Sequence, residues 1–205
     1  AQYHLGLSIW MDVNPDYKKA TSWFKKALKV GLPLPSYLMG LAYFNGQGTE
    51  IDYKKSFDCF VIAANKLEHV DAFLRLGKAY ENGLGVIQDY DKALFWYEKA
   101  IAKNNIPAYI SMGLLYQNIN FPRFDIQKSF NMFLTVLEKN EGKIEDKIRI
   151  AFKYMKGEGV EKDFQKALYW FEQSEKEDTV ESKKYFFEFA GYDDGNMFTY
   201  RDFML

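Results

Sequence analysis

Apolar, small and aromatic residues recur along the chain in blocks with a period of about 36 residues. In three blocks an apolar residue and a glycine precede a tyrosine by one helical turn, as in Leu76-Gly77 and Tyr80; the first block has Ile9 in place of the tyrosine and the last has Ala151 in place of the glycine. This spacing places the three residues on one face of a helix. A turn and an aspartate follow, after which a second pattern of helical spacing begins. The blocks therefore each predict two antiparallel helices, called helix A and helix B below.

The landmarks of the blocks keep nearly constant offsets. The aspartate expected at the start of helix B is followed four residues later by an alanine or a serine. These small residues are Ala20, Ser56, Ala93, Ser129 and Ala167, so their spacings are 36, 37, 36 and 38. Periods of this size indicate a stacked solenoid rather than a domain with one central core. We therefore expect an all-α solenoid with repeats over 1–33, 34–69, 70–106, 107–143 and 144–178, and a C-terminal capping helix and tail over 179–205.

Single residue types within a repeat have specific predicted roles. A glycine inside helix A costs about 1 kcal/mol relative to alanine, so it needs a packing reason. We expect it to face the small residue of helix B, as Gly77 would face Ala93. The lysine before each small residue is expected on a solvated face. The aspartates are expected to be helix N-caps: Asp16, Asp52, Asp89, Asp125 and Asp163.

The turn between the helices is marked by glycines in three repeats. The sequences are Gly46-Gln47-Gly48, Gly83-Leu84-Gly85 and Gly157-Glu158-Gly159. Glycine tolerates the positive φ that a helix C-terminus and a tight turn require. No strand precedes these glycines and no lysine-serine or lysine-threonine pair follows them, so a phosphate-binding loop is not indicated. Repeat four has Asn118-Ile119-Asn120-Phe121-Pro122 instead, and its turn must differ.

Composition removes several classes of function. The net charge of −1 does not indicate binding to nucleic acid or to an anionic membrane. No apolar run reaches the roughly 18 residues of a membrane-spanning helix. We expect a monomer that does not insert into a membrane and that binds another protein.

The compartment stays undecided. The single cysteine, Cys59, excludes an internal disulfide and is expected to be buried packing. The sequence starts at Ala1 inside a predicted helix, which suggests a trimmed N-terminus without its targeting segment. The bacterial periplasm or cytoplasm fits best, with the eukaryotic secretory pathway as the alternative.

Catalytic and metal motifs are missing from the sequence. The two histidines, His4 and His69, lie about two repeats apart, and neither is part of a metal-ligand pair. A hydrolase or transferase needs a convergent nucleophile, base and orienting group, and no such set is recognisable. The capping aspartates lie a full repeat apart, which favours capping over metal binding. We expect no enzyme, no cofactor and no metal.

Repeat three carries the motifs Leu76-Gly77, Tyr80, Gly85-Val86, Asp89-Tyr90, Lys92-Ala93, Trp96-Tyr97 and Lys99-Ala100. This pattern resembles the Sel-1-like repeat family, a relative of tetratricopeptide repeats. The resemblance covers about residues 3–175 and implies a right-handed superhelix of helix pairs that acts as a protein-interaction scaffold. Cysteine-rich secreted relatives carry a disulfide in each repeat. This chain lacks those cysteines, so the weak β-lactam-hydrolysing activity of that branch is not expected here.

The resemblance also implies which residues could bind a partner, because helix A lines the concave groove of tetratricopeptide-type arrays. Relative to the residue before the glycine, the groove positions lie two before, two after and five after it. They are Tyr3, Leu7, Trp10, Tyr37, Leu41, Phe44, Leu74, Lys78, Glu81, Ile110, Leu114, Gln117, Ile148, Phe152 and Met155. An exposed apolar groove would indicate a protein-binding site. Tight curvature that buries these side chains against one another is an equal alternative.

Two functions follow from this reading. The first is a non-enzymatic scaffold or adaptor that holds a partner's helix or extended segment in the groove. The second is a bacterial inhibitor, such as an immunity protein that neutralises a toxin by direct binding. The aromatic residues between Phe186 and Phe203 are expected to cap the last repeat, with a docking segment as the rival interpretation.

Overall fold

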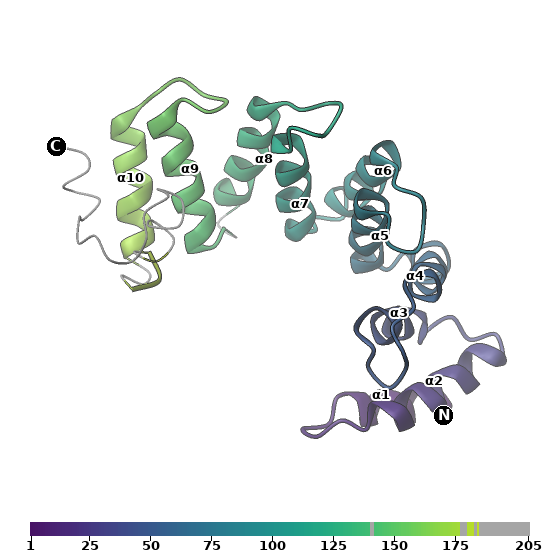
Figure 1. The fold of residues 1–205 in the computed structure, drawn as a ribbon. Coiled ribbons are helices and arrows are strands. Elements are labelled where there is room, and N and C mark those ends of the chain that lie inside the picture. The colour runs from purple at the N-terminus through teal and green to yellow at the C-terminus, as the bar shows by residue number, and fades with distance from the viewer. Residues whose placement is uncertain (140–141, 177–179, 183, 185–205) are drawn as a thin grey trace. The chain divides into compact units, whose positions relative to one another are not determined.

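The computed structural model describes residues 1–139, 142–176, 180–182 and 184, and within these the chain forms ten helices and no strand. The prediction of an all-α fold built from consecutive helix pairs is confirmed (Figure 1). Of the predicted C-terminal cap, only residues 180–182 and 184 are described, so the remainder of that prediction lies outside the described residues.

The chain divides into two compact units, residues 1–108 and 109–205, here called unit 1 and unit 2. Unit 1 contains α1 (Gln2–Trp10), α2 (Tyr17–Lys29), α3 (Ser36–Asn45), α4 (Tyr53–Leu67), α5 (Val70–Asn82) and α6 (Tyr90–Ile101). Helix α7 (Ile106–Gln117) crosses the boundary, and unit 2 continues with α8 (Ile126–Glu138), α9 (Ile144–Lys156) and α10 (Phe164–Glu175). In both units the odd-numbered helices are the predicted A helices and the even-numbered ones the B helices.

An aromatic ring of helix B lies directly against the glycine of helix A. A Cβ added to Gly77 would come closer than 3.0 Å to the ring of Tyr97, and Gly40 stands in the same relation to Phe60. Ala93 was the expected neighbour of Gly77, but the atoms nearest to a Cβ at this position belong to Tyr97. Tyr97 lies four residues after Ala93 on helix B. Its ring reaches across the helix pair to Gly77, and the glycine leaves room for it.

The small residue of helix B still lies at the helix–helix contact. The Oγ atom of Ser56 donates a 2.8 Å hydrogen bond to the carbonyl oxygen of Gly40, within the second pair. In the first pair, a Cβ on Gly6 would lie 3.2 Å from the carbonyl oxygen of Ala20. Glycine on one helix and a small residue on the other therefore both allow the close approach, while the ring fills the space beside them.

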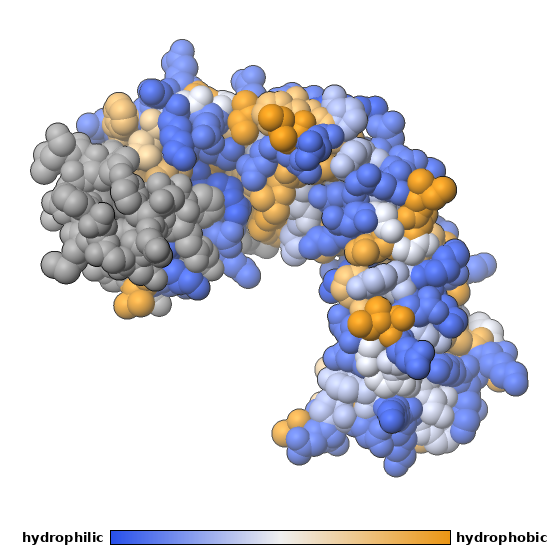
Figure 2. Space-filling view, viewed as in Figure 1, coloured by the Kyte–Doolittle hydropathy of each residue, from blue (hydrophilic) through white to orange (hydrophobic). Residues whose placement is uncertain are grey.

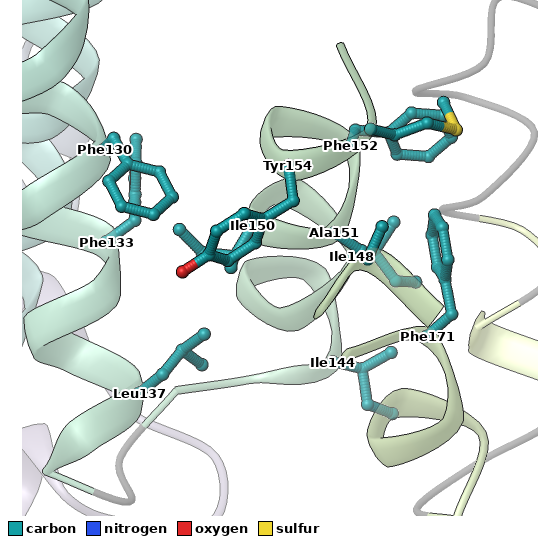
Figure 3. Close-up of a cluster of buried hydrophobic side chains, with 12 residues drawn as sticks. Phe130, Phe133, Leu137, Ile144, Ile148, Ile150, Ala151, Phe152, Tyr154 and Phe171 are labelled. Carbon is teal, nitrogen blue, oxygen red and sulfur yellow. The ribbon is translucent and has the colours of Figure 1, made fainter. Parts of the chain in front are cut away.

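Helix α9 is the centre of the core of unit 2. Ile148, Ile150 and Phe152 on α9 share one cluster with Phe133 of α8 and Phe171 of α10 (Figure 3). Because α9 packs between two helices, more of its faces are buried than sequence spacing alone suggests.

The glycine turns also join successive repeats. Gly83 ends α5 with φ at +66°, which is the left-handed conformation that glycine tolerates. Gly85, two residues later, has φ at +75°, and a Cβ there would clash with the backbone of Tyr53 in the preceding repeat. This glycine lets the turn of one repeat rest on the start of helix B in the repeat before it.

Repeat four makes its turn differently, as its sequence predicts. The backbone N–H of Phe121 donates a 2.9 Å hydrogen bond to the carbonyl oxygen of Asn118. The Phe121 ring is 2% exposed and packs edge-on against Tyr116 at 5.7 Å between ring centroids. A buried ring therefore takes the place of the second glycine in this turn.

The aspartates cap helix B as predicted. The Asp89 carboxylate accepts a 3.0 Å hydrogen bond from the backbone N–H of Lys92, and Asp52 accepts one of 2.9 Å from Lys55. The same side chains form ion pairs, at 2.8 Å for Lys92 with Asp89. The capping bond itself recurs in the other three repeats, between Asp16 and Lys19, Asp125 and Lys128, and Asp163 and Lys166.

The lysine before the small residue of helix B also contacts the tyrosine of helix A. The ammonium of Lys92 lies 5.5 Å from the centroid of the Tyr80 ring, and Lys166 lies 5.3 Å from Tyr154. The backbone N–H of Asp89 donates a 2.9 Å hydrogen bond to the carbonyl oxygen of Tyr80. Tyrosine, aspartate and lysine thus form a joint that fixes the end of helix A to the start of helix B. The lysines are exposed, as predicted, and make these contacts in addition.

We predict that Gly77→Ala destabilises the chain although alanine favours a helix by about 1 kcal/mol. The new methyl group would overlap the buried ring of Tyr97, and overpacking of this kind costs about 1–3 kcal/mol. Denaturant unfolding would measure the loss. Gly113→Ala is the matched control, because its Cβ would lie 3.1 Å from Phe133 and needs only a small shift. Equal unfolding free energies for the two variants would contradict the ring-over-glycine contact.

We also predict that acid weakens the joints. The Lys92 side chain, followed by its backbone N–H, holds the pKa of Asp89 below its ordinary value. A carboxylate with a lowered pKa in the folded state stabilises the fold above its unfolded pKa of about 3.9. That contribution is lost as the pH falls through the folded pKa. Melting temperatures at pH 7 and pH 3 should therefore differ less for Asp89→Asn than for the parent chain.

Glu98→Gln is the control for this measurement, because Glu98 is an exposed carboxylate on the same helix that caps nothing. The melting temperature of Glu98→Gln should fall between pH 7 and pH 3 by as much as that of the parent chain. If Asp89→Asn and Glu98→Gln change that dependence equally, the joint does not contribute to acid sensitivity.

Candidate protein-binding surface

The predicted groove residues of unit 1 lie on α1, α3 and α5, and we call these eight positions the helix-A face. They are Tyr3, Leu7, Trp10, Tyr37, Leu41, Phe44, Lys78 and Glu81. Seven of them are half-buried and Lys78 is exposed. Leu74, which shares the predicted set, is buried and 9% exposed.

The aromatic residues of α1 pack against aromatic residues of α2. Trp10 contacts the ring of Tyr17 edge-on at 4.8 Å and lies 5.8 Å from Phe24. Tyr3 lies 6.2 Å from the same Phe24 ring. Their inner edges therefore hold α1 against α2, while their outer edges remain partly accessible.

On α3 the aromatic side chains meet residues of the next repeat. Tyr37 stacks on His69 with 4.0 Å between ring centroids. Burial raises the pKa of the Tyr37 hydroxyl, and a hydrogen bond with Arg75 acts in the opposite direction. The Arg75 guanidinium also lies 5.8 Å from the centroid of the Phe44 ring. Arg75 thus links the two ends of α3 to α5.

On α5 the two charged positions behave differently. Lys78 is exposed, whereas the carboxylate of Glu81 accepts a hydrogen bond from the hydroxyl of buried Tyr97. Glu81 therefore has a structural contact within its own repeat. Lys78 makes no ion pair within the described part of the chain.

The predicted positions of unit 2 are mostly covered. Leu114 is 40% exposed, but Phe152 is 4% exposed and Met155 is 9% exposed. Both buried residues belong to the cluster around α9. Both are therefore left out of the surface considered below.

A pocket of about 160 Å³ lies between α3, α4 and α5. It brings together two predicted residues from different repeats, Phe44 and Lys78. The other lining residues are Tyr53, Ser56, Phe57, Phe60, Arg75, Ala79, Asn82 and Leu84. We call this the α3–α5 pocket. Four of its ten lining residues are aromatic, and its cations are Arg75 and Lys78.

Arg75 was not among the predicted residues. It stands immediately before the reference residue Leu76, outside the three offsets that define the groove. No repeated residue type marks this position, since the other repeats have Leu38, Ser111 and Arg149 there. Only the contact of Arg75 with Phe44 on α3, in the preceding repeat, reveals its role.

A second, more open hollow of about 420 Å³ lies between α2, α3 and α4. Lys25, Lys29 and Lys55 line it together with Tyr43 and Cys59. Burial raises the pKa of the Cys59 thiol to about 11. The thiol therefore stays protonated near neutral pH. Cys59 is buried and packs between the helices, as its position in the repeat predicts.

On the face shown in Figure 2, apolar residues of unit 1 form small separate patches among charged ones. None of the described helices is long and apolar enough to cross a membrane. Across the described ranges, no three histidine, cysteine or acidic side chains gather as a metal site would require.

Consecutive helix pairs whose landmark residues recur at nearly constant spacings along the chain define a helical repeat protein. The model of the Sel1 repeat matches residues 1–32, 36–66, 71–105 and 148–178, which is more than half of the chain. The chain belongs to the Sel1 repeat family. Repeat four, which lacks the glycine turn, falls between the matched segments.

Relatives and solved structures agree with this family. Protein SHC1 of Saccharomyces cerevisiae is 36% identical over 90 residues, 44% of this chain and 17% of its own. The Sel1-repeat-containing protein YjcO of Escherichia coli K12 is 29% identical over 117 residues, 55% of this chain and 51% of its own. The chain thus spans about half of YjcO and a much smaller part of SHC1.

Two crystal structures have the same fold. A Sel1 repeat protein from Oxalobacter formigenes has a TM-score of 0.74 at 26% identity, covering 90% of this chain and 73% of its own. The protein c5321, a protective antigen of uropathogenic Escherichia coli with the SLR fold, also has a TM-score of 0.74 at 28% identity. That match covers 86% of this chain and 38% of c5321.

Proposed function

We propose that this protein is a non-enzymatic adaptor that binds a segment of a partner protein on the helix-A face of unit 1. The observation that carries the proposal is the α3–α5 pocket, where two residues predicted from separate repeats line one apolar cavity. Family membership supports the general role, since Sel1 repeats typically serve protein–protein interaction.

The distribution of aromatic residues supports the same face. The rings of helix B that lie against the glycines, such as Phe60 and Tyr97, are at most 2% exposed and hold the pairs together. The rings of helix A, such as Tyr37 and Phe44, keep partly accessible edges. Half-buried aromatic residues next to a cation are typical of interface hot spots.

The inhibitor reading stays a prediction. A protein that neutralises a toxin by direct binding could use the same surface, and no observation in the structure favours it over an adaptor. The identity of the partner would separate the two roles.

We predict that Leu41→Glu abolishes partner binding while helicity and melting temperature remain close to those of the parent. Leu41 is half-buried, so a carboxylate there stays hydrated in the free protein. In the complex it would lose water without gaining a partner, which costs several kcal/mol. The measurement is affinity capture with the tagged intact chain from a lysate of the source cells, quantified by mass spectrometry.

Phe95→Glu is the matched control, because Phe95 is 49% exposed on α6, outside the helix-A face. It should retain the captured partner. Lys78→Glu should weaken capture less than Leu41→Glu and in a salt-dependent way. If Leu41→Glu and Lys78→Glu both capture the partner as the parent does, the binding surface lies elsewhere on the chain.

A further inference from the structure

The α3–α5 pocket is open because of residues that differ from those at the same position in other repeats. Ala79 lines the pocket three residues after Leu76. The equivalent residue is Leu115 in repeat four and Lys153 in repeat five. Lys153 is 3% exposed and lies 5.9 Å from the Phe133 ring, the counterpart of Phe60. A long side chain thus occupies in repeat five the space that Ala79 leaves empty.

The first two repeats close the equivalent space in another way. Trp10 is the counterpart of Phe44, and it packs on Tyr17 and Phe24, the counterparts of Tyr53 and Phe60. The indole of Trp10 is larger than the phenyl ring of Phe44 and extends further over these two rings. Residue 42, the counterpart of Ala79 in repeat two, is also alanine. The α3–α5 pocket is thus lined by a small residue at position 79, where repeats four and five have larger side chains, and by a phenyl ring at position 44, where repeat one has an indole.

The size of the pocket fits one side chain. A cavity of about 150 Å³ accommodates a benzene molecule, and the α3–α5 pocket measures about 160 Å³. Drug-sized ligands need about 300–1,000 Å³. An aromatic ring or a leucine side chain is therefore the largest group that fits.

The two charged side chains that line the pocket are both cations. Arg75 and Lys78 line it, and neither has a carboxylate within ion-pair distance among the described residues. Glu81, on the same helix, is already bound to the Tyr97 hydroxyl. Arg75 is oriented by its contacts with Tyr37 and the Phe44 ring. Two cations beside an apolar cavity complement a carboxylate that adjoins an apolar side chain.

We propose that the α3–α5 pocket recognises a peptide segment in which a leucine or an aromatic residue stands within two positions of an aspartate or a glutamate. The apolar side chain enters the cavity between Phe44, Phe57 and Phe60, and the carboxylate pairs with Lys78 and Arg75. This inference rests on the proposed function and adds the chemistry of the partner to it.

The experiment starts from a phage-displayed library of random twelve-residue peptides selected on the intact chain. The enriched peptides should share an apolar residue with a neighbouring acid. Replacing that apolar residue by alanine should weaken binding at least 10-fold, and replacing the acid by its amide should weaken it about 5-fold at 0.15 M salt. Affinities would be measured by fluorescence anisotropy of the labelled peptide.

Variants of the chain test the pocket directly. Ala79→Lys and Ala79→Leu introduce the residue types of repeats five and four, and each should reduce affinity more than 10-fold. Lys78→Gln and Arg75→Gln should each reduce it about 5-fold, with a smaller effect at 0.5 M salt. Lys66→Gln removes the same charge from an exposed position on α4 and should leave affinity unchanged.

The outcomes separate the two proposals. Peptides that lack an acid but lose binding with Leu41→Glu would overturn the inference and leave the proposed function standing. Peptides whose affinity is unchanged by Leu41→Glu and by both Ala79 variants would overturn both. A library that yields no binding peptide would also contradict both, because a pocket for a short segment should select one.

Discussion

The close contact between a glycine of helix A and an aromatic ring of helix B is the constraint on which the structure depends. Without a side chain at Gly77, the Tyr97 ring lies flat against the backbone of α5 and is fully buried. The cost of a glycine within a helix, about 1 kcal/mol, is offset by the burial of a whole ring, which contributes about 1.5–3 kcal/mol. The contact also fixes which face of each helix points inward.

This constraint assigns the two kinds of aromatic residue to different tasks. The rings of helix B that lie against the glycines hold the pairs together, and of these Phe60 also lines the α3–α5 pocket. On helix A, the Phe44 ring meets Tyr53 of its own repeat at 5.5 Å and Arg75 of the following repeat at 5.8 Å. The binding surface is thus a consequence of how the repeats are built, and its specificity comes from the few positions where one repeat differs from another.

Features that depend on local sequence could be predicted. The capping role of Asp89 and the glycine turn at Gly83 involve neighbours within a few residues, so their spacing alone identifies them. The exposure of Lys92 was predicted but its contact with Tyr80 was not, because that contact exists only when the turn brings the two helices together. The contact of Gly77 with Tyr97 was missed for a similar reason, since spacing gives the facing helix but not the reach of each side chain.

The candidate site was predicted less completely. Phe44 and Lys78 were named from their offsets, but Arg75 was not, because its position carries no repeated residue type. Phe152 was named although it is buried, because offsets along one helix contain no information about how many neighbours that helix has. Residues such as Ala79 show their role only when they are compared with Leu115 and Lys153 in other repeats.

We propose that a partner binds on the helix-A face and not on the outer surface of helix B. Photo-crosslinking from a benzophenone side chain, placed singly at position 78 or at position 95, tests this most directly. Position 78 lies on the helix-A face and position 95 on α6, and both side chains are exposed. The account predicts a crosslink to the bound partner from position 78 alone. Efficient crosslinking from position 95, with none from position 78, would contradict it.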